Sequence, residues 1–222
     1  MKILAMDTSD REGSAALLED ESLIVRRCFQ GPEGHMLHLP KAVAEILAAA
    51  SWTPASLDLL VVTLGPGAFT GLRIALGFAK GLAMAGQIPL KGISTLELLK
   101  NGLGGSGAPA FMAAFSPQTH VSPILVAMDA RRGDVFAALY HTDGRCLWPP
   151  GRWTPEQLTA RIAQVPEGVR VVWEGDRDAV ILGRLGLHRF NVEGTDDPLT
   201  LEPLYLRRAD AEQAAQAEPV GA

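Results

Sequence analysis

Residues Ile3–Asp7 read I-L-A-M-D and residues Leu125–Asp129 read L-V-A-M-D, and this repeated apolar run ending in aspartate decides the expected fold. Each run has the length and composition of a buried strand. After each aspartate a short polar turn leads to a glycine, Gly13 or Gly133, and a second apolar strand follows. The chain therefore reads as two copies of one unit, with chance similarity of two short strands as the alternative.

Outward from the first strand, the pattern predicts three strands and then alternating helices and strands. The expected strands cover 14–18, 23–29, 59–64 and 89–93, and the expected helices cover 37–50, 69–85 and a run beginning at 94. The second half repeats the order with strands over 125–129 and 135–140, a helix opening at Thr154-Pro155 and a strand over 169–173.

A long Gly-, Pro- and Ser-rich segment separates the two halves and marks the expected domain boundary. We expect an α/β protein of two lobes, the second reduced. The divisions are an N-terminal lobe at 1–101, a connecting loop at 102–122, a C-terminal lobe at 123–208 and a flexible tail at 209–222.

Composition narrows the class of protein. The 222 residues carry 20 Lys+Arg against 25 Asp+Glu, a formal net charge of −5, which lacks the basic footprint of a free-standing nucleic-acid binder. Cys28 and Cys146 fit no disulfide or metal framework, so a reducing cytoplasm is the simplest location. The apolar run before Asp7 is too short for a signal peptide, and the uncharged stretch 101–128 is broken by Gly and Pro, so no membrane segment is expected.

The stretch L-G-P-G-A-F-T-G-L-R-I at Leu64–Ile74 joins a buried strand to a helix. Gly65, Pro66 and Gly67 either offer backbone N–H groups to an anion at the helix N-terminus or only permit a tight turn. The glycine spacing is not that of a P-loop, and no Lys-Ser/Thr pair follows it.

The titratable residues offer weak candidates for chemistry. Asp7 and Asp129 end equivalent strands and are candidate ligands for magnesium-bound water. For Asp129 we prefer the interpretation that its side chain caps the following turn. For Asp7 both capping and a magnesium site stay open. His35 and His38 lie three residues apart, but no third ligand accompanies them, so surface or capping roles are favoured over a metal site.

The strongest signal from the residues alone is an apolar surplus on two expected helices. From Phe69 to Ala85 only Thr70, Arg73 and Lys80 are polar. Such helices are either buried in their own domain or form a helical interface with a partner, and the second interpretation is favoured here. The candidate interface residues are Leu39, Val43, Ile46, Gly65, Pro66, Gly67, Leu72, Arg73, Leu76 and Phe78.

Five stretches in order resemble the bacterial TsaB (YeaZ) family. They are I-L-A-M-D-T-S at Ile3–Ser9, the Leu64–Ile74 stretch, I-S-T-L-E at Ile93–Glu97, D-A-R-R-G-D-V-F at Asp129–Phe136 and P-L-Y-L-R at Pro203–Arg207. The Gly-Pro-Gly helix opening is close to diagnostic. Two departures are Ala68, where the pattern usually has serine, and the length of the Gly102–Ser122 loop.

The resemblance implies two actin-like lobes of the actin, Hsp70 and sugar-kinase superfamily, with a ribonuclease H-like fold. It also implies a non-catalytic subunit of the complex that forms threonylcarbamoyladenosine in tRNA. The expected partners are the catalytic paralogue TsaD and the ATPase TsaE, or a second copy when isolated, with tRNA contacted only indirectly. No cofactor is expected for the chain alone, whereas ATP and Mg²⁺ are compatible with the assembled complex.

Two other functional classes stay open at this point. One is an independent ATPase or kinase of the superfamily that uses Asp7 and Asp129. The other is a metallopeptidase-like protein that uses His35 and His38.

Overall fold

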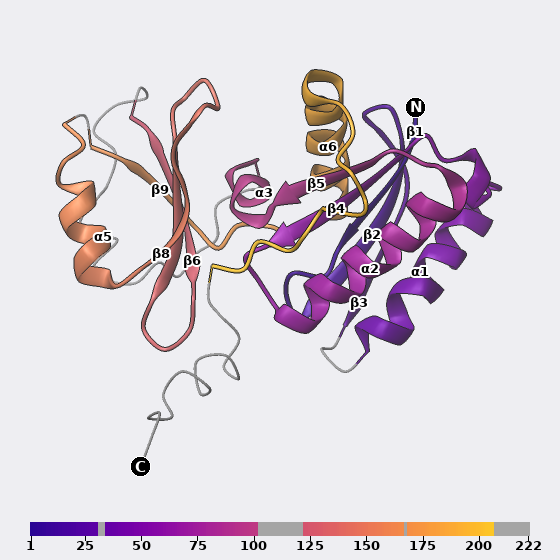
Figure 1. Cartoon of the computed structure of the whole chain (residues 1–222), viewed down its shortest axis with the longest axis horizontal. Coiled ribbons are helices and arrows are strands. Elements are labelled where there is room, and N and C mark those ends of the chain that lie inside the picture. The colour runs from indigo at the N-terminus through magenta and orange to yellow at the C-terminus, as the bar shows by residue number, and fades with distance from the viewer. Residues whose placement is uncertain (31–33, 102–121, 167, 207–222) are drawn as a thin grey trace, which may run out of the picture.

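The computed structural model describes residues 1–30, 34–101, 122–166 and 168–206. They form two lobes, each built on one β-sheet with helices against it (Figure 1). The strands are β1 Lys2–Asp7, β2 Glu12–Glu19, β3 Ser22–Gln30, β4 Leu59–Gly65, β5 Leu90–Ser94, β6 Ile124–Asp129, β7 Val135–Tyr140, β8 Cys146–Trp153 and β9 Arg170–Trp173. The helices are α1 His35–Ala49, η1 Pro54–Ser56, α2 Phe69–Gly86, α3 Thr95–Asn101, α5 Pro155–Ile162 and α6 Ala179–Glu193.

The first sheet has the strand order β3-β2-β1-β4-β5. Strands β1, β2 and β3 form an antiparallel meander, and β4 and β5 add in parallel to β1 after helical crossovers. The buried strand β1 lies at the centre, so its carboxyl end at Asp7 faces the start of the helix that follows β4.

The second sheet repeats this order in shorter form as β8-β7-β6-β9. Its meander is again antiparallel and β9 again pairs in parallel with the first strand, but among the described residues no strand corresponds to β5. The predicted α/β architecture of two actin-like lobes with a reduced second lobe is therefore confirmed. Thr154 opens α5 as predicted, because its side chain accepts a hydrogen bond from the Gln157 backbone N–H at 3.3 Å.

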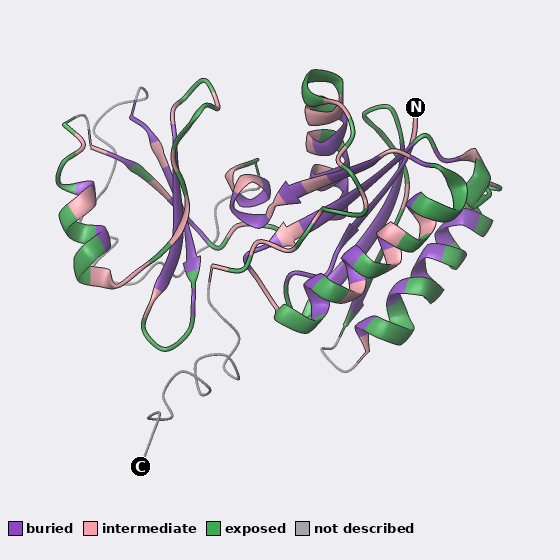
Figure 2. Cartoon of the chain, in the orientation of Figure 1, coloured by how far each residue is buried: buried purple, intermediate pink, exposed green. Residues whose placement is uncertain are grey.

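Helices cover both faces of the first sheet. Helices α1 and α2 lie side by side on one face and bury their inner sides there (Figures 1 and 2). Helix α6 covers the other face, where its Leu182 and Leu187 join Ile3 and Val61 in a second core. The second sheet lies between α5 on one face and α3 on the other.

Helix α6 was not predicted from the sequence, and it belongs to the range assigned to the C-terminal lobe although it completes the core of the first sheet. Glycines inside it allow this close contact. A Cβ at Gly186 would lie 2.3 Å from a Val61 methyl, and one at Gly183 would lie 2.6 Å from a Leu18 methyl. Glycine weakens a helix in isolation, so this helix depends on packing that the local sequence does not reveal.

The predicted division into lobes stays a prediction, because the connecting loop at 102–122, except its last residue, and the tail at 209–222 lie outside the described residues. Within the described ranges, no helix combines the length and the apolar character needed to cross a membrane.

Candidate functional site

Asp7, at the carboxyl end of β1, is fully buried. Its Oδ1 accepts hydrogen bonds from the Thr63 hydroxyl at 2.6 Å and from the Ser9 backbone N–H at 3.0 Å. Its Oδ2 has no hydrogen-bond partner among the described residues. Burial raises the pKa of Asp7 above its ordinary value, and the bonds from Thr63 and Ser9 and the charge of Arg177 only partly oppose this. Asp7 thus caps its turn and presents no surface to a hydrated metal ion.

Asp129 occupies the equivalent place in the second lobe and is exposed. Its Oδ1 accepts a hydrogen bond from the Arg131 backbone N–H at 2.7 Å, which is the capping geometry favoured from the sequence. Within the described ranges, no group of three His, Cys, Asp or Glu side chains is arranged to hold a metal ion. The enclosed Asp7 carboxylate does not fit the magnesium site proposed for it from the sequence.

The Gly-Pro-Gly loop packs against the loop that follows β1. A Cβ at Gly67 would lie 2.4 Å from the Ser9 carbonyl oxygen, and one at Gly71 would lie 2.0 Å from the Thr8 carbonyl oxygen. The Ala68 backbone N–H, at the start of α2, donates to the Ser9 carbonyl at 2.8 Å. This geometry supports the tight-turn interpretation, because a backbone carbonyl occupies a donor that an anion would need.

The two histidines have different environments. His35 is buried rather than at the surface, its Nε2 lies 2.9 Å from the Asp10 carbonyl oxygen, and its ring meets Phe29 edge-on. His38 is exposed on the next turn of α1. The placement of His35 in the core offers nothing to the metallopeptidase alternative.

Much of the predicted interface set lies inside the chain's own core. The buried members are Leu39, Val43, Ile46, Gly65, Pro66, Leu72 and Leu76. This part of the prediction is wrong, because the inner stripes of α1 and α2 already pack on the first sheet. Gly67 is half-buried against Ser9, Phe78 is half-buried, and Arg73 is exposed. For these three residues a role at an interface stays a prediction.

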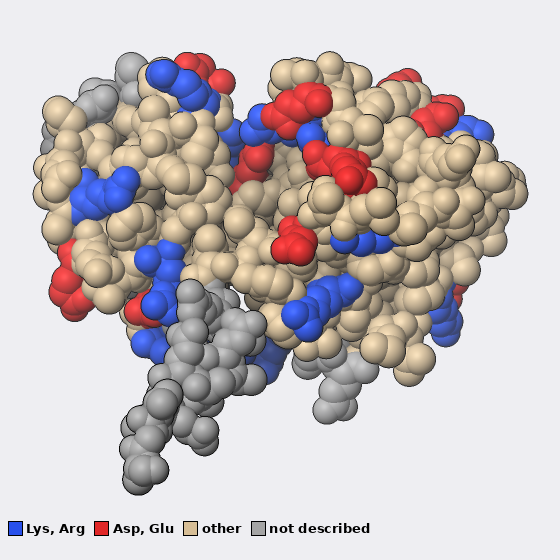
Figure 3. Space-filling model, in the orientation of Figure 1, with Lys and Arg blue, Asp and Glu red and all other residues tan. Residues whose placement is uncertain are grey.

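The outer sides of α1 and α2 carry a different set of apolar and small residues, which we call the α1–α2 surface. Its members are Met36, Leu37, Ala44, Ala48, Phe69, Arg73, Gly77, Lys80, Gly81 and Met84, nearly all exposed. Leu37 is 76% exposed, Met36 68% and Met84 59%. Most of the surface over these helices is uncharged (Figure 3). The apolar surplus noted in the sequence of these helices already indicated such a surface, because a helix that is apolar all round has apolar residues on its outer side as well as on its inner side.

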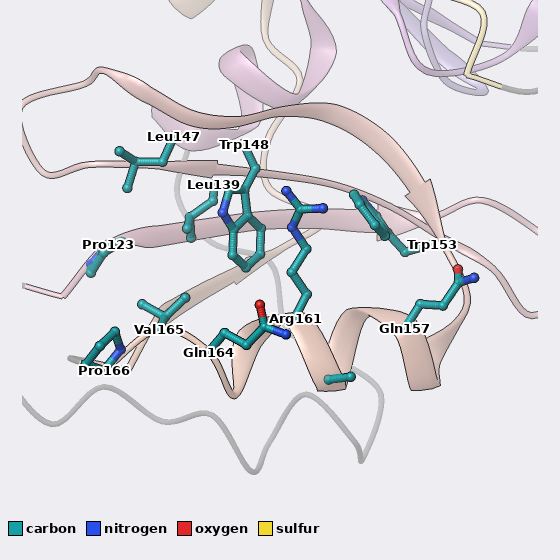
Figure 4. A pocket seen from close by; sticks show the side chains of 11 residues that line it. Pro123, Leu139, Leu147, Trp148, Trp153, Gln157, Arg161, Gln164, Val165 and Pro166 are labelled. Carbon is teal, nitrogen blue, oxygen red and sulfur yellow. The ribbon is translucent and has the colours of Figure 1, made fainter.

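A hollow of about 750 Å³ lies elsewhere, between β8 and α5 in the second lobe. The Arg161 guanidinium lies between the Trp148 and Trp153 rings, 4.7 and 4.6 Å from their centroids (Figure 4). Among the described residues that line this groove, Arg161 alone carries an ionisable side chain. This groove therefore holds neither a general acid–base pair nor a nucleophile.

Comparison with known proteins assigns the family. The model of the family described as TsaD, tRNA N6-adenosine threonylcarbamoyltransferase, matches residues 32–149. The TsaB protein of Escherichia coli is 32% identical over 67% of this chain, which spans only 58% of that relative's length. The TsaB protein of Bacillus subtilis is 31% identical over 87% of this chain and 76% of its own length.

A solved structure supports the fold independently. YeaZ from Pseudomonas aeruginosa superposes with a TM-score of 0.70 over 92% of this chain and 99% of that chain, at 24% sequence identity. The fold is thus shared over nearly the whole length of both proteins. With the identities above, the chain belongs to the TsaB family of tRNA threonylcarbamoyladenosine biosynthesis proteins.

Proposed function

We propose that this chain is a non-catalytic subunit of the complex that forms threonylcarbamoyladenosine in tRNA, and that it binds a TsaD-like paralogue through the α1–α2 surface. Family membership supports a role in this biosynthesis. The transfer of the threonylcarbamoyl group to adenosine is assigned to the paralogue, and the ATPase TsaE is expected to complete the assembly.

The exposed apolar side chains of the α1–α2 surface carry this proposal. Single exposed apolar residues are ordinary, but Met36, Leu37, Phe69 and Met84 stand on two adjacent helices. Gly77 and Gly81 leave open space on the outside of α2, because a Cβ at either position would meet no atom within 4 Å. Apolar anchors beside small residues allow the close approach of helices from another protein.

The surroundings of Asp7 support the non-catalytic part of the proposal. A carboxylate that organises magnesium and phosphate must face a cleft, whereas Asp7 is enclosed by Thr63 and the turn at Ser9. We therefore expect the isolated chain neither to turn over ATP nor to modify tRNA. ATP turnover near one per second that disappears in Asp7→Asn would overturn this assignment.

The direct test is complex formation with TsaD of the same organism. The two purified proteins are mixed and the mass of the complex is measured by light scattering after size exclusion. A heterodimer that forms at micromolar concentration is the expected result. Two proteins that elute separately at that concentration, while both are folded by circular dichroism, would refute the proposed role.

A further inference from the structure

The C-terminal segment brings two distant sequence motifs together on α2. The Leu204 backbone N–H donates to the Leu64 carbonyl at 2.7 Å, which fixes the segment beside the end of β4. Tyr205 then lies against the Phe69 ring, with their centroids 5.1 Å apart. The Gly-Pro-Gly stretch and the P-L-Y-L stretch thus meet on one surface, although they are more than one hundred residues apart in the chain.

Arg73 contacts both of these aromatic residues. Its Nε donates to the Tyr205 hydroxyl at 2.7 Å, and its guanidinium carbon lies 4.0 Å from the Phe69 ring centroid and 5.6 Å from that of Tyr205. A guanidinium has five N–H donors, and Tyr205 accepts from one of them. In the described part of the chain Arg73 forms no ion pair. An ordered arginine with unused donors is prepared to bind a carboxylate, since the ordering of its long side chain precedes binding.

A groove of about 440 Å³ begins at Arg73 and runs between α2 and the C-terminal segment. Its lining is Arg73, Leu76, Gly77, Lys80, Leu201, Glu202, Pro203 and Tyr205. Arg73 and Lys80 lie seven residues apart on one helix face, which separates them by about 10 Å along the axis. The open space over Gly77 lies between them. No carboxylate within the described ranges forms an ion pair with Lys80 either.

We propose that this groove receives a helix of the TsaD-like partner that carries an Asp or Glu, with that carboxylate bound by Arg73 and steered by Lys80. Tyr205 acts as a positioning residue, because it orients the Arg73 guanidinium. This inference rests on the proposed function and specifies the chemistry of the partner. A second copy of the chain fits this groove less well than TsaD. Each copy would bring the positive charges of Arg73 and Lys80 to the interface, and among the described residues of the lining Glu202 is the one negative charge that could balance them.

The experiment measures the affinity of the chain for TsaD of the same organism by calorimetry, at low and physiological salt. Arg73→Glu is expected to weaken binding at least about 30-fold, since it replaces a charge pair with a repulsion. Lys80→Glu is expected to weaken it less and to lose most of its effect at the higher salt concentration. Arg170→Gln, on an exposed position of β9, is the matched control and should bind like wild type.

Tyr205→Phe tests the positioning role, because it removes the hydroxyl and keeps the ring. We expect a weakening of about threefold to tenfold in the wild-type background and none in an Arg73→Gln background, where the hydroxyl has nothing to orient. Equal effects in both backgrounds would overturn the positioning role. Thermal melting identifies any variant that fails to fold. Lys80→Glu keeps the proposal testable in that case, because within the described ranges the Lys80 side chain forms no ion pair that the substitution would break.

The outcomes separate this inference from the proposed function. Wild-type chain that does not bind TsaD refutes the proposed function itself. Wild-type chain that binds, together with Arg73→Glu and Lys80→Glu variants that bind equally well, refutes the groove and leaves the function standing. If Arg73→Glu removes self-association but leaves TsaD binding unchanged, the occupant is a second copy and the inference is wrong.

Discussion

Leu37 and Leu72 separate the two kinds of apolar residue on α1 and α2, and one pair of substitutions tests the distinction. Leu37 is 76% exposed on α1, whereas Leu72, on the inner side of α2, is 2% exposed. We predict that Leu37→Asp preserves folding and weakens binding of TsaD, and that Leu72→Ala destabilises the chain itself. The same residue type thus gives opposite phenotypes according to the face of the helix that carries it.

The magnitudes follow from burial. Truncation of a buried leucine to alanine lowers the free energy of unfolding by about 2–5 kcal/mol, because it removes packed methyl groups and leaves a cavity. For a chain of this length the melting temperature falls about 2–4 °C per kcal/mol. Leu37→Asp is expected to change folding by less than about 0.5 kcal/mol. In the complex, a leucine with three quarters of its surface available contributes about 1–2 kcal/mol, and a buried aspartate adds a further cost.

Binding of TsaD should therefore weaken at least about 30-fold in Leu37→Asp, a loss of about 2 kcal/mol. Calorimetric titration measures the affinity, and thermal melting of the same preparations measures stability. The reasoning fails if Leu72→Ala melts like wild type, because Leu72 would then not belong to the core. It also fails if Leu37→Asp binds TsaD with unchanged affinity, since the interface would then lie away from the start of α1.

Three further predictions concern the chain alone. Because the folded-state pKa of Asp7 is raised above 3.8, folding takes up a proton and the free energy of unfolding falls as pH rises above that value. Asp7→Asn, which keeps an acceptor for Thr63, should lose less stability than wild type between about pH 4 and pH 7 in urea titrations; parallel pH curves would contradict this. Lys91→Met, which removes the buried partner of the half-exposed Glu193 and Asp196, should cost about 1–2 kcal/mol by the same method, and an unchanged midpoint would refute it. The acidic chain alone should not bind tRNA at physiological salt, and micromolar binding in a polarisation titration would reveal an overlooked basic face.

The strand framework was predictable because strands of both lobes carry strong local signals. The runs ending at Asp7 and Asp129 are short and apolar and are followed by tight turns. They form β1 and β6, each the first strand of its sheet in sequence order. The helix opening at Thr154 also carried its signal in four residues. Each of these features depends on neighbours in sequence, which a single chain displays directly.

Helix α6 escaped prediction because its signal is not local. Gly183 and Gly186 lower its intrinsic helix propensity, and the contacts that they allow with Leu18 and Val61 of the first sheet compensate. The role of Tyr205 escaped for the same reason, since its partners Phe69 and Arg73 are distant in sequence. The outer and inner sides of α1 and α2 were confused because both are apolar, and only the position of the sheet tells which side is buried.

The loop that follows β1 connects the burial of Asp7 with the proposal that this chain is not catalytic. Ser9 closes over Asp7 through its backbone N–H, and its carbonyl accepts from the Ala68 N–H at the start of α2. The Thr8 hydroxyl donates to the Gly71 carbonyl at 2.7 Å, which ties the same loop to the first turn of that helix. These bonds use a carboxylate and a helix N-terminus that a nucleotide site would have to keep free. They also fix the start of α2 on the loop after β1, and a helix that is already positioned loses less entropy when a partner binds. These contacts support our proposal that the outer side of α2 binds a protein and that the chemistry belongs to the paralogue.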